Sequence, residues 1–308
     1  GWIIKYIISY ATTFDAPADF TAFIASPETV IWHLVFMALA IAICYKGVAG
    51  IEKASKIMLP ALFVLLIIIM IRSVTLEGAS VRLIFEPKGG FTLSSINAAL
   101  GQVFYSLSLC MGITITYGSY LSKKENIPKS CGLIAGMDTM LAIFAGIAIF
   151  PAVFVFGLEP GQGPGLIFGT LPKVFEAMTG GSIFAIAFFI LVFFAAITSA
   201  IALLEVVVSF AIDSWGWSRK KAVAVMGITV FCLGIPSALS FGVLGDITIL
   251  NYSVFDFIGM ITDNILLPIG GILMCIFVGW KFDINKLAGE MEQGCASFKI
   301  KKLWIGCI

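Results

Sequence analysis

The sequence is short of charge and of histidine, and it lacks the cysteine spacings of metal sites. Only 12% of its 308 residues are charged, against about 25% in soluble domains. The formal net charge is +1, so no basic excess indicates nucleic-acid binding, and none is expected. Because 60% of the residues are hydrophobic and the mean hydropathy is +1.06, the composition predicts a membrane protein with the lipid bilayer as a partner.

Enzyme signatures are missing as well. His33 is the single histidine, which excludes an HExxH zinc site. There is no GxxxxGK[ST] loop and hence no sign of an ATP-driven pump. The seven cysteines show no CxxC or zinc spacing, so they are interpreted as small buried side chains and not as a disulfide framework. We therefore expect that the protein is not an enzyme and uses no organic cofactor.

Long apolar runs divided by short polar ones predict an all-α polytopic membrane protein with a single transmembrane domain over residues 1–308. A loop at 158–181, with a short helix of its own, is expected on the extracellular side. Full helices are expected at 28–45, 52–76, 95–121, 131–157, 182–212, 218–240 and 253–279, with partial helices at 1–14 and 303–308.

Both ends of the chain fall in apolar runs. The run that follows Gly1 is too short to span a bilayer, which needs about 20 residues of helix. Another apolar run begins at Leu303 and reaches the last residue. These two features predict that the chain is a fragment of a longer polytopic protein.

The basic residues fall in alternate loops and so predict an orientation. Fourteen of the 19 lysines and arginines lie on one side of the expected membrane. Cytoplasmic loops carry such an excess, so we expect these loops to face the cytoplasm and the protein to lie in the inner membrane of a cell. The clusters are Lys46, Lys53 and Lys56; Lys123, Lys124 and Lys129; Arg219, Lys220 and Lys221; and Lys281, Lys286, Lys299, Lys301 and Lys302.

The run from Gln102 to Gly112 places two serines and a glycine inside an otherwise apolar span. Two half-helices that meet at the membrane midplane would leave carbonyls free for cations and N–H groups free for anions, as in many secondary transporters. The alternative is a continuous helix whose serines bond to carbonyls four residues earlier. The pattern leaves both structures open.

Asp138 is the second unusual position, some seven residues into the span expected at 131–157. A carboxylate inside a membrane is expensive unless it is paired or binds a cation, which makes this residue a functional candidate. The alternative is an acid close enough to the interface to be hydrated.

Ala195, Thr198 and Ser199 have the spacing i, i+3, i+4, so one carbonyl and two hydroxyls share a helix face. These oxygens could bind a hard monovalent cation. The same small and hydroxylated residues also serve helix packing in membranes, and the residues alone favour packing. Glu205 and Asp213 lie nearer the cytoplasmic end and are interpreted as solvated or snorkelling acids.

Several long motifs occur in an order that resembles the bacterial neurotransmitter:sodium symporter family, the sodium-coupled amino-acid transporters of the LeuT fold. The resemblance implies an inverted-repeat fold whose second repeat is complete here. The first repeat would be truncated, lacking the first two helices and part of the third. The motifs are GIEKASKIMLPALF at 50–63, GQVFYSLSLCMGITITYGSYL at 101–121, LPKVFEAMTGG at 171–181, FFAAITSAIALLE at 193–205, SRKKA at 218–222 and FDF at 255–257.

The resemblance also implies roles for particular residues and two sodium sites. Ser106 and Asp138 would bind the first sodium. The Ala195 carbonyl and the Thr198 and Ser199 hydroxyls would bind the second. The substrate-binding residues would be Tyr105, Ser106, Ser108, Met111, Ser199 and Leu203. The gating residues would be Tyr105 and Asp256 on the outer side and Asp213 and Tyr120 on the inner side.

These roles predict a sodium-coupled symporter that imports a neutral, hydrophobic amino acid. The expected partners are the amino acid, sodium and the bilayer, and a homodimer is a further candidate. The alternative hypothesis is an inert truncated membrane fragment or scaffold without transport activity. An intact reading frame upstream of the Gly1 codon would favour the transporter, and a stop codon there would favour the inert fragment.

Overall fold

The computed structural model describes residues 1–17, 19–86, 92–158, 163–282 and 284–293. The chain divides into two compact units. The first unit holds residues 1–88 and 142–257, and the second holds residues 89–141 and 258–308. The helix expected at 303–308 lies outside the described residues.

Six helical segments among the described residues are long and apolar enough to cross a membrane, as the composition predicts. The full span expected at 95–121 is not one of them, because its helix is interrupted. The six are α3 (Glu28–Tyr45), α4 (Gly47–Val74), α8 (Ile127–Val155), α10 (Gly181–Trp215), α11 (Arg219–Ala238) and the segment Val254–Lys281.

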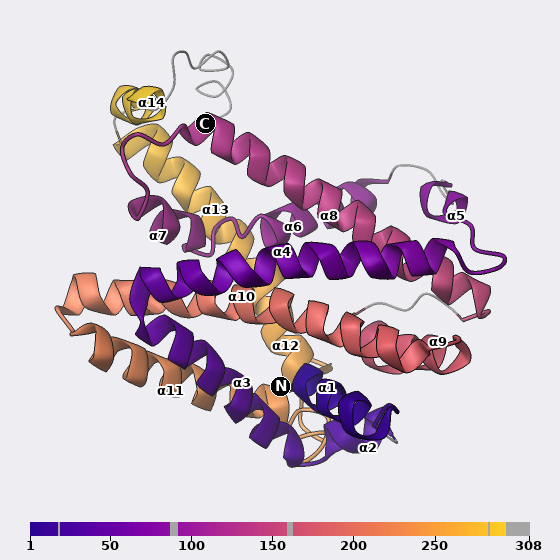
Figure 1. Cartoon of the computed structure of the whole chain (residues 1–308). Coiled ribbons are helices and arrows are strands. Elements are labelled where there is room, and N and C mark those ends of the chain that lie inside the picture. The colour runs from indigo at the N-terminus through magenta and orange to yellow at the C-terminus, as the bar shows by residue number, and fades with distance from the viewer. Residues whose placement is uncertain (18, 87–91, 159–162, 283, 294–308) are drawn as a thin grey trace. The chain divides into compact units, whose positions relative to one another are not determined.

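In the first unit α10 is the central helix. It packs against α4 and α11 and also contacts α1 (Trp2–Thr13) and α3, and the pairs α4 with α10 and α3 with α11 lie side by side (Figure 1). Its 35 residues give roughly 52 Å of helix. That length exceeds the hydrocarbon core of about 30 Å, so α10 extends past the membrane at one end or both.

The turn between α10 and α11 is tight, and its residues explain why. Gly216 ends α10 with φ 64° and donates to the Ile212 carbonyl at 3.0 Å, and Trp217 donates to the Ala211 carbonyl at 3.4 Å. The bond from Gly216 to Ile212 is the single bond of an αL C-cap, in which glycine suits the left-handed position. Ser218 then caps α11 by accepting from the Lys221 N–H at 3.4 Å. The chain therefore folds back on itself, and α11 packs against α10.

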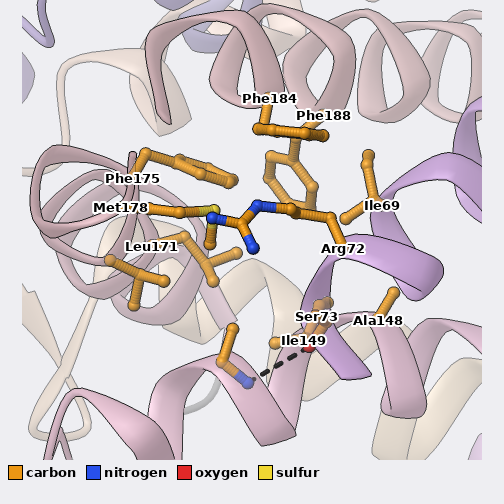
Figure 2. Close-up of a pocket in the computed structure, with 12 residues that line it drawn as sticks. Ile69, Arg72, Ser73, Ala148, Ile149, Leu171, Phe175, Met178, Phe184 and Phe188 are labelled. Carbon is orange, nitrogen blue, oxygen red and sulfur yellow. Dashed lines mark hydrogen bonds between the residues drawn. The ribbon is translucent and has the colours of Figure 1, made fainter. Parts of the chain in front are cut away.

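A buried hydrogen bond joins α4 to α8 where α8 contains a proline. Pro151 has no N–H and disturbs the helical ladder around it. The Ala152 N–H donates to the Ser73 hydroxyl of α4 at 3.2 Å (dashed line in Figure 2). In the same cavity the Arg72 guanidinium lies 5.6 Å from the centre of the Phe184 ring. α4, α8 and the start of α10 are thus joined by one polar contact and one cation–π contact.

Several short elements lie between the long helices. Asp19 caps α2 by accepting from the Thr21 hydroxyl at 2.7 Å and from its N–H at 2.8 Å, and these bonds lower the pKa of Asp19. The loop expected at 158–181 contains η1, a π-helical turn, followed by α9. The short elements of the first unit are α2 (Phe20–Ala25), α5 (Arg82–Phe85), η1 (Gly165–Thr170), α9 (Leu171–Ala177) and the hairpin of β1 (Thr248–Ile249) and β2 (Tyr252–Ser253).

The second unit holds the interrupted helix and the last span. Val254–Lys281 begins with α12, whose first four residues belong to the first unit and the rest to the second, and it contains two π-helical turns. The sequence does not predict the short helices α2 and α5 of the first unit or α14 of the second. The elements are α6 (Leu93–Ser106), α7 (Ile113–Ser119), α12 (Val254–Ile261), η2 (Thr262–Leu266), α13 (Leu267–Ile276), η3 (Phe277–Lys281) and α14 (Ile284–Gln293).

Candidate functional site

The helix expected at 95–121 is interrupted between Ser106 and Ile113, so a single continuous helix is wrong. Ser108, Cys110 and Gly112 have φ values of 53°, 64° and 79°. Left-handed backbone is rare outside glycine, and two such non-glycine residues in one segment mark a conformation held by its surroundings. Of the two structures that the serines and the glycine leave open, the chain adopts the interrupted one.

The interruption leaves backbone oxygens without helical donors. The backbone bonds described here end on the carbonyls of Val103, Phe104 and Tyr105, and the ladder resumes when Thr116 donates to Gly112 at 3.0 Å. Within the described part of the chain, no backbone N–H bonds to the carbonyls of residues 106–111. Unsatisfied backbone at this depth in a membrane is tolerated where it faces protein or a polar cavity. These oxygens are therefore available to a cation or an ammonium group.

Two glycines of α13 let the interrupted segment approach closely. A Cβ atom placed on Gly271 would lie 3.0 Å from the Cys110 sulfur, and one on Gly270 would lie 3.4 Å from the Cys110 carbonyl oxygen. The first of these distances is too tight for a larger side chain without movement of the thiol. Glycine at these positions therefore gives the segment room to pack on α13.

Asp138 meets Ser106 at the interruption. The Ser106 hydroxyl, on the last residue of α6, donates to Asp138 Oδ1 at 2.6 Å. Asp138 is half-buried and is the twelfth of the 29 residues of α8, which begins at Ile127. The carboxylate is therefore nearer the middle of the helix than the sequence suggested, and the two residues predicted for the first sodium site are in direct contact.

The second predicted sodium site lies on α10, in the first unit. Thr198 donates to the carbonyls of Phe194 at 2.9 Å and Ala195 at 3.0 Å, and Ser199 donates to Ala195 at 3.1 Å. The hydroxyl protons are used by the helix, while the oxygen lone pairs stay free for a cation. Thr198 is half-buried and Ser199 is exposed in this unit. The three oxygens are thus brought together, on a helix that remains continuous.

The other residues predicted to bind substrate are divided between the two units. Tyr105, Ser108 and Met111 flank or lie in the interruption of the second unit, and Ser199 and Leu203 lie on α10 of the first. Tyr105 is 58% exposed and Leu203 is 47% exposed, and neither has a charged partner among the described contacts. Each unit thus holds some of the residues predicted to bind substrate.

The predicted gating residues have different environments. Asp256 donates its N–H to the Ser253 hydroxyl at 3.1 Å, so Ser253 caps the start of α12, and the Asp256 carboxylate accepts from the same hydroxyl at 2.7 Å. Asp213 is exposed near the C-terminal end of α10, as its interpretation as a solvated acid predicts. Tyr120, at the end of α7, lies edge-on to Tyr117 at 6.2 Å.

Glu205 is not the solvated acid that the sequence suggests, and this prediction is wrong. Its exposure is 0%. Arg219 of α11 donates to both carboxylate oxygens, at 2.7 and 2.6 Å, and also to the Cys44 carbonyl at the end of α3. A bidentate pair of this kind is what allows a carboxylate to be buried. The signal in the sequence was the Trp215–Ser218 turn, which brings Arg219 back toward Glu205.

The chain is similar to known membrane transporters. The sequence model of the sodium:neurotransmitter symporter family matches residues 15–308. An uncharacterized sodium-dependent transporter of Bacillus subtilis, YhdH, is 39% identical over 306 residues, which cover 96% of this chain and 68% of the relative. An uncharacterized sodium-dependent transporter of Haemophilus influenzae is 38% identical over 328 residues, which cover all of this chain and 71% of the relative.

A solved structure supports the same relationship. The crystal structure of MhsT in complex with L-phenylalanine superposes with a TM-score of 0.88 at 43% identity. The match covers 99% of this chain and 72% of that one. It confirms the all-α, LeuT-like membrane fold, and the matches are to transporters and not to enzymes.

Proposed function

The chain belongs to the sodium:neurotransmitter symporter family, and on that premise we propose that it binds sodium and a neutral, hydrophobic amino acid in a symporter that imports the amino acid. The observation that carries this proposal is the Ser106–Asp138 contact at an interrupted membrane helix.

The first sodium site is proposed at Asp138, Ser106 and the carbonyls of residues 106–111. A carboxylate near the middle of a membrane helix needs a positive partner, and one serine hydroxyl does not neutralise it. A sodium ion supplies one positive charge and accepts the nearby hydroxyl and carbonyl oxygens as ligands. This site has its own negative charge, so an added chloride ion would be repelled.

The second sodium site is proposed at Ala195, Thr198 and Ser199. Its ligands would be neutral, weakly polarisable oxygen atoms, which suit a monovalent cation better than a transition metal. Because the two hydroxyls already share the Ala195 carbonyl, a bound ion would need only a small rotation of either hydroxyl.

The substrate is proposed to have an uncharged, apolar side chain. Unused carbonyls at the interruption suit its ammonium group, while Tyr105, Met111 and Leu203 offer apolar surface without a fixed charge. A charged side chain buried there without a partner would be costly. The complex of MhsT with L-phenylalanine shows that a relative at 43% identity binds an amino acid of this class.

The orientation is proposed from the basic clusters. The loops around Lys53, Lys124 and Lys220 would face the cytoplasm, and the loop at 158–181 would face the outside, with the protein in the inner membrane of a bacterial cell. A homodimer remains a candidate assembly.

The test is uptake of radiolabelled leucine into liposomes that contain the complete gene product. We expect accumulation with an inward sodium gradient and none with potassium in its place. Phenylalanine and methionine should compete with the label, and lysine and glutamate should not. Equal uptake in potassium would contradict sodium coupling, and competition by lysine or glutamate alone would contradict the substrate class.

A further inference from the structure

A separate polar cavity lies in the first unit, where the end of α1 meets the connection between α9 and α10. Its volume is about 320 Å³, and its lining includes Tyr10, Asp15, Glu176, Gly181 and Ser182. None of these residues belongs to the substrate or sodium sites proposed above. The lining contains two carboxylates, one phenol and no lysine, arginine or histidine.

Tyr10 is the observation that indicates a ligand. Its side chain is 1% exposed, and its hydroxyl is the one buried side-chain oxygen or nitrogen without a hydrogen-bond partner in the described part of the chain. The ring is held in place by stacking on Phe189, with centroids 5.8 Å apart. A buried phenol without a partner costs free energy, so each such group in a native structure calls for an explanation. Both carboxylates lie within electrostatic reach of this hydroxyl.

The charge of the cavity selects a cation. Asp15 and Glu176 are both exposed and bring two negative charges, while one oxygen of Asp15 also accepts from the Ala16 N–H at 3.2 Å. Gly181 already donates to the Met178 carbonyl at 2.9 Å and Ile183 to the Gly180 carbonyl at 3.1 Å. Two carboxylates and no basic side chain in the lining therefore favour a cation over an anion.

The two walls of the cavity are already joined without a ligand. The Ser182 hydroxyl at the start of α10 donates to the Phe14 carbonyl at the end of α1 at 2.6 Å. Gly181 packs so tightly on the Phe175 carbonyl that no Cβ fits there, which fixes the end of α9 and hence Glu176 against α10. Tyr10 of α1, Asp15 just after α1 and Glu176 of α9 thus line one cavity whose walls are joined.

We propose that this cavity binds a calcium ion, with the Asp15 and Glu176 carboxylates and the Tyr10 hydroxyl as protein ligands and water completing the shell. Calcium takes six to eight oxygen ligands in flexible geometry, whereas magnesium requires near-ideal octahedral geometry and dehydrates reluctantly. A site of three protein oxygens in a wide cavity suits the larger ion. The loop that holds Glu176 is on the side proposed to be extracellular. The ion would hold the end of α1 to the α9–α10 connection.

Calcium binding can be measured without any transport. The complete gene product, purified in detergent at constant sodium concentration, is titrated with calcium chloride by calorimetry, and its thermal unfolding midpoint is recorded in parallel. We expect saturable binding with a rise in the midpoint. Asp15→Asn and Glu176→Gln should each weaken binding by about tenfold or more, because each removes one charged ligand. Tyr10→Phe should weaken it less, since the ring packing is retained.

Glu77→Gln is the matched control, because Glu77 is an exposed acid of the same unit that does not line the cavity. It should bind calcium like the unmodified protein. Asp15 is exposed, so Asp15→Asn should fold normally. This variant still tests the proposal if another variant fails to fold. Absence of calcium binding, binding that the carboxylate variants leave unchanged, or magnesium binding as tight as calcium binding would each overturn the proposal. None of these results would bear on sodium-coupled uptake.

Discussion

Two regions of the molecule carry the oxygens predicted to bind sodium, and they are built differently. Between α6 and α7 the helix is interrupted, three residues have left-handed backbone, and the carbonyls of residues 106–111 have no backbone donor among the described residues. Along α10 the helix continues unbroken past Thr198 and Ser199, and both hydroxyls bond to carbonyls of their own helix. The first region also contains a carboxylate, and the second contains only neutral oxygens.

The difference shows how far each region needs a bound ligand to satisfy its polar groups. An interrupted helix with a carboxylate in a membrane costs free energy unless a ligand binds there. Hydroxyls that donate to carbonyls of their own helix are satisfied without an ion. We therefore expect substitutions at the interruption to have larger effects on sodium binding than substitutions on α10.

Asp138→Asn should have the largest effect. It removes the negative charge that balances a desolvated sodium, at a cost of about 3 to 5 kcal/mol, the range for breaking a buried ion pair. Sodium-driven uptake should fall to background, with the protein still inserted in the membrane. The matched control is Thr139→Val, because the Thr139 hydroxyl bonds only to the Ala135 carbonyl of its own helix at 2.9 Å. An unchanged sodium dependence in Asp138→Asn would refute the first sodium site.

Glu205→Gln tests whether the buried pair of Glu205 and Arg219 stabilises the first unit. We expect a loss of unfolding free energy of about 3 kcal/mol, because the Arg219 guanidinium would lose the carboxylate charge that it pairs with. Thermal unfolding in detergent measures it. Glu52→Gln is the comparison, since Glu52 forms an exposed pair with Lys56 at 2.6 Å, and exposed pairs contribute little. Equal small shifts in both variants would show that the buried pair does not stabilise the first unit.

Thr198→Ala should have a moderate effect that is confined to sodium. Loss of one neutral oxygen ligand should cost on the order of 1 to 3 kcal/mol and raise the sodium concentration for half-maximal uptake. Ser209→Ala is the control on the same helix, because Ser209 makes a similar bond to the Val206 carbonyl at 3.1 Å outside the site. If both variants behave like the unmodified protein, the α10 hydroxyls serve packing and not ion binding.

Ser73→Ala should have the smallest effect on sodium binding, namely none, and should change stability alone. It removes the acceptor of the Ala152 N–H in the cavity of Figure 2, at about 1 to 3 kcal/mol for a buried donor left unpaired. The thermal midpoint should fall while the sodium dependence of uptake stays the same. A change in sodium dependence would mean that the α4–α8 contact is coupled to the sodium sites.

Much of the fold follows from the sequence because apolar length is a local property. The runs at 28–45 and 182–212 give α3 and α10 with their ends within three residues. The apolar pattern predicts a helix start at 131, whereas α8 begins at Ile127, where Asn126 accepts from the Lys129 N–H at 3.0 Å and caps the helix. A start at 131 places Asp138 closer to the end of the helix than the structure does.

The site is less predictable, because its partners come from distant parts of the chain. Glu205 is buried only because the turn after α10 returns Arg219 to it, and no pattern within α10 shows that. The residues at 106–112 are equally consistent with a continuous helix whose serines donate to carbonyls of the same helix, as Thr198 does in α10. Ser106 and Asp138 each looked unusual alone, and their contact at 2.6 Å required the structure.

The central claim is that sodium at Asp138 and Ser106 and an apolar amino acid at the same interruption bind cooperatively. The most direct measurement is the affinity of the purified complete gene product for radioactive sodium with and without saturating phenylalanine, together with the affinity for phenylalanine with and without sodium. Linkage requires that each ligand tighten the other by the same factor. We predict a factor of about ten or more, abolished in Asp138→Asn and retained in Thr139→Val. A sodium affinity that does not change when phenylalanine binds would contradict the account.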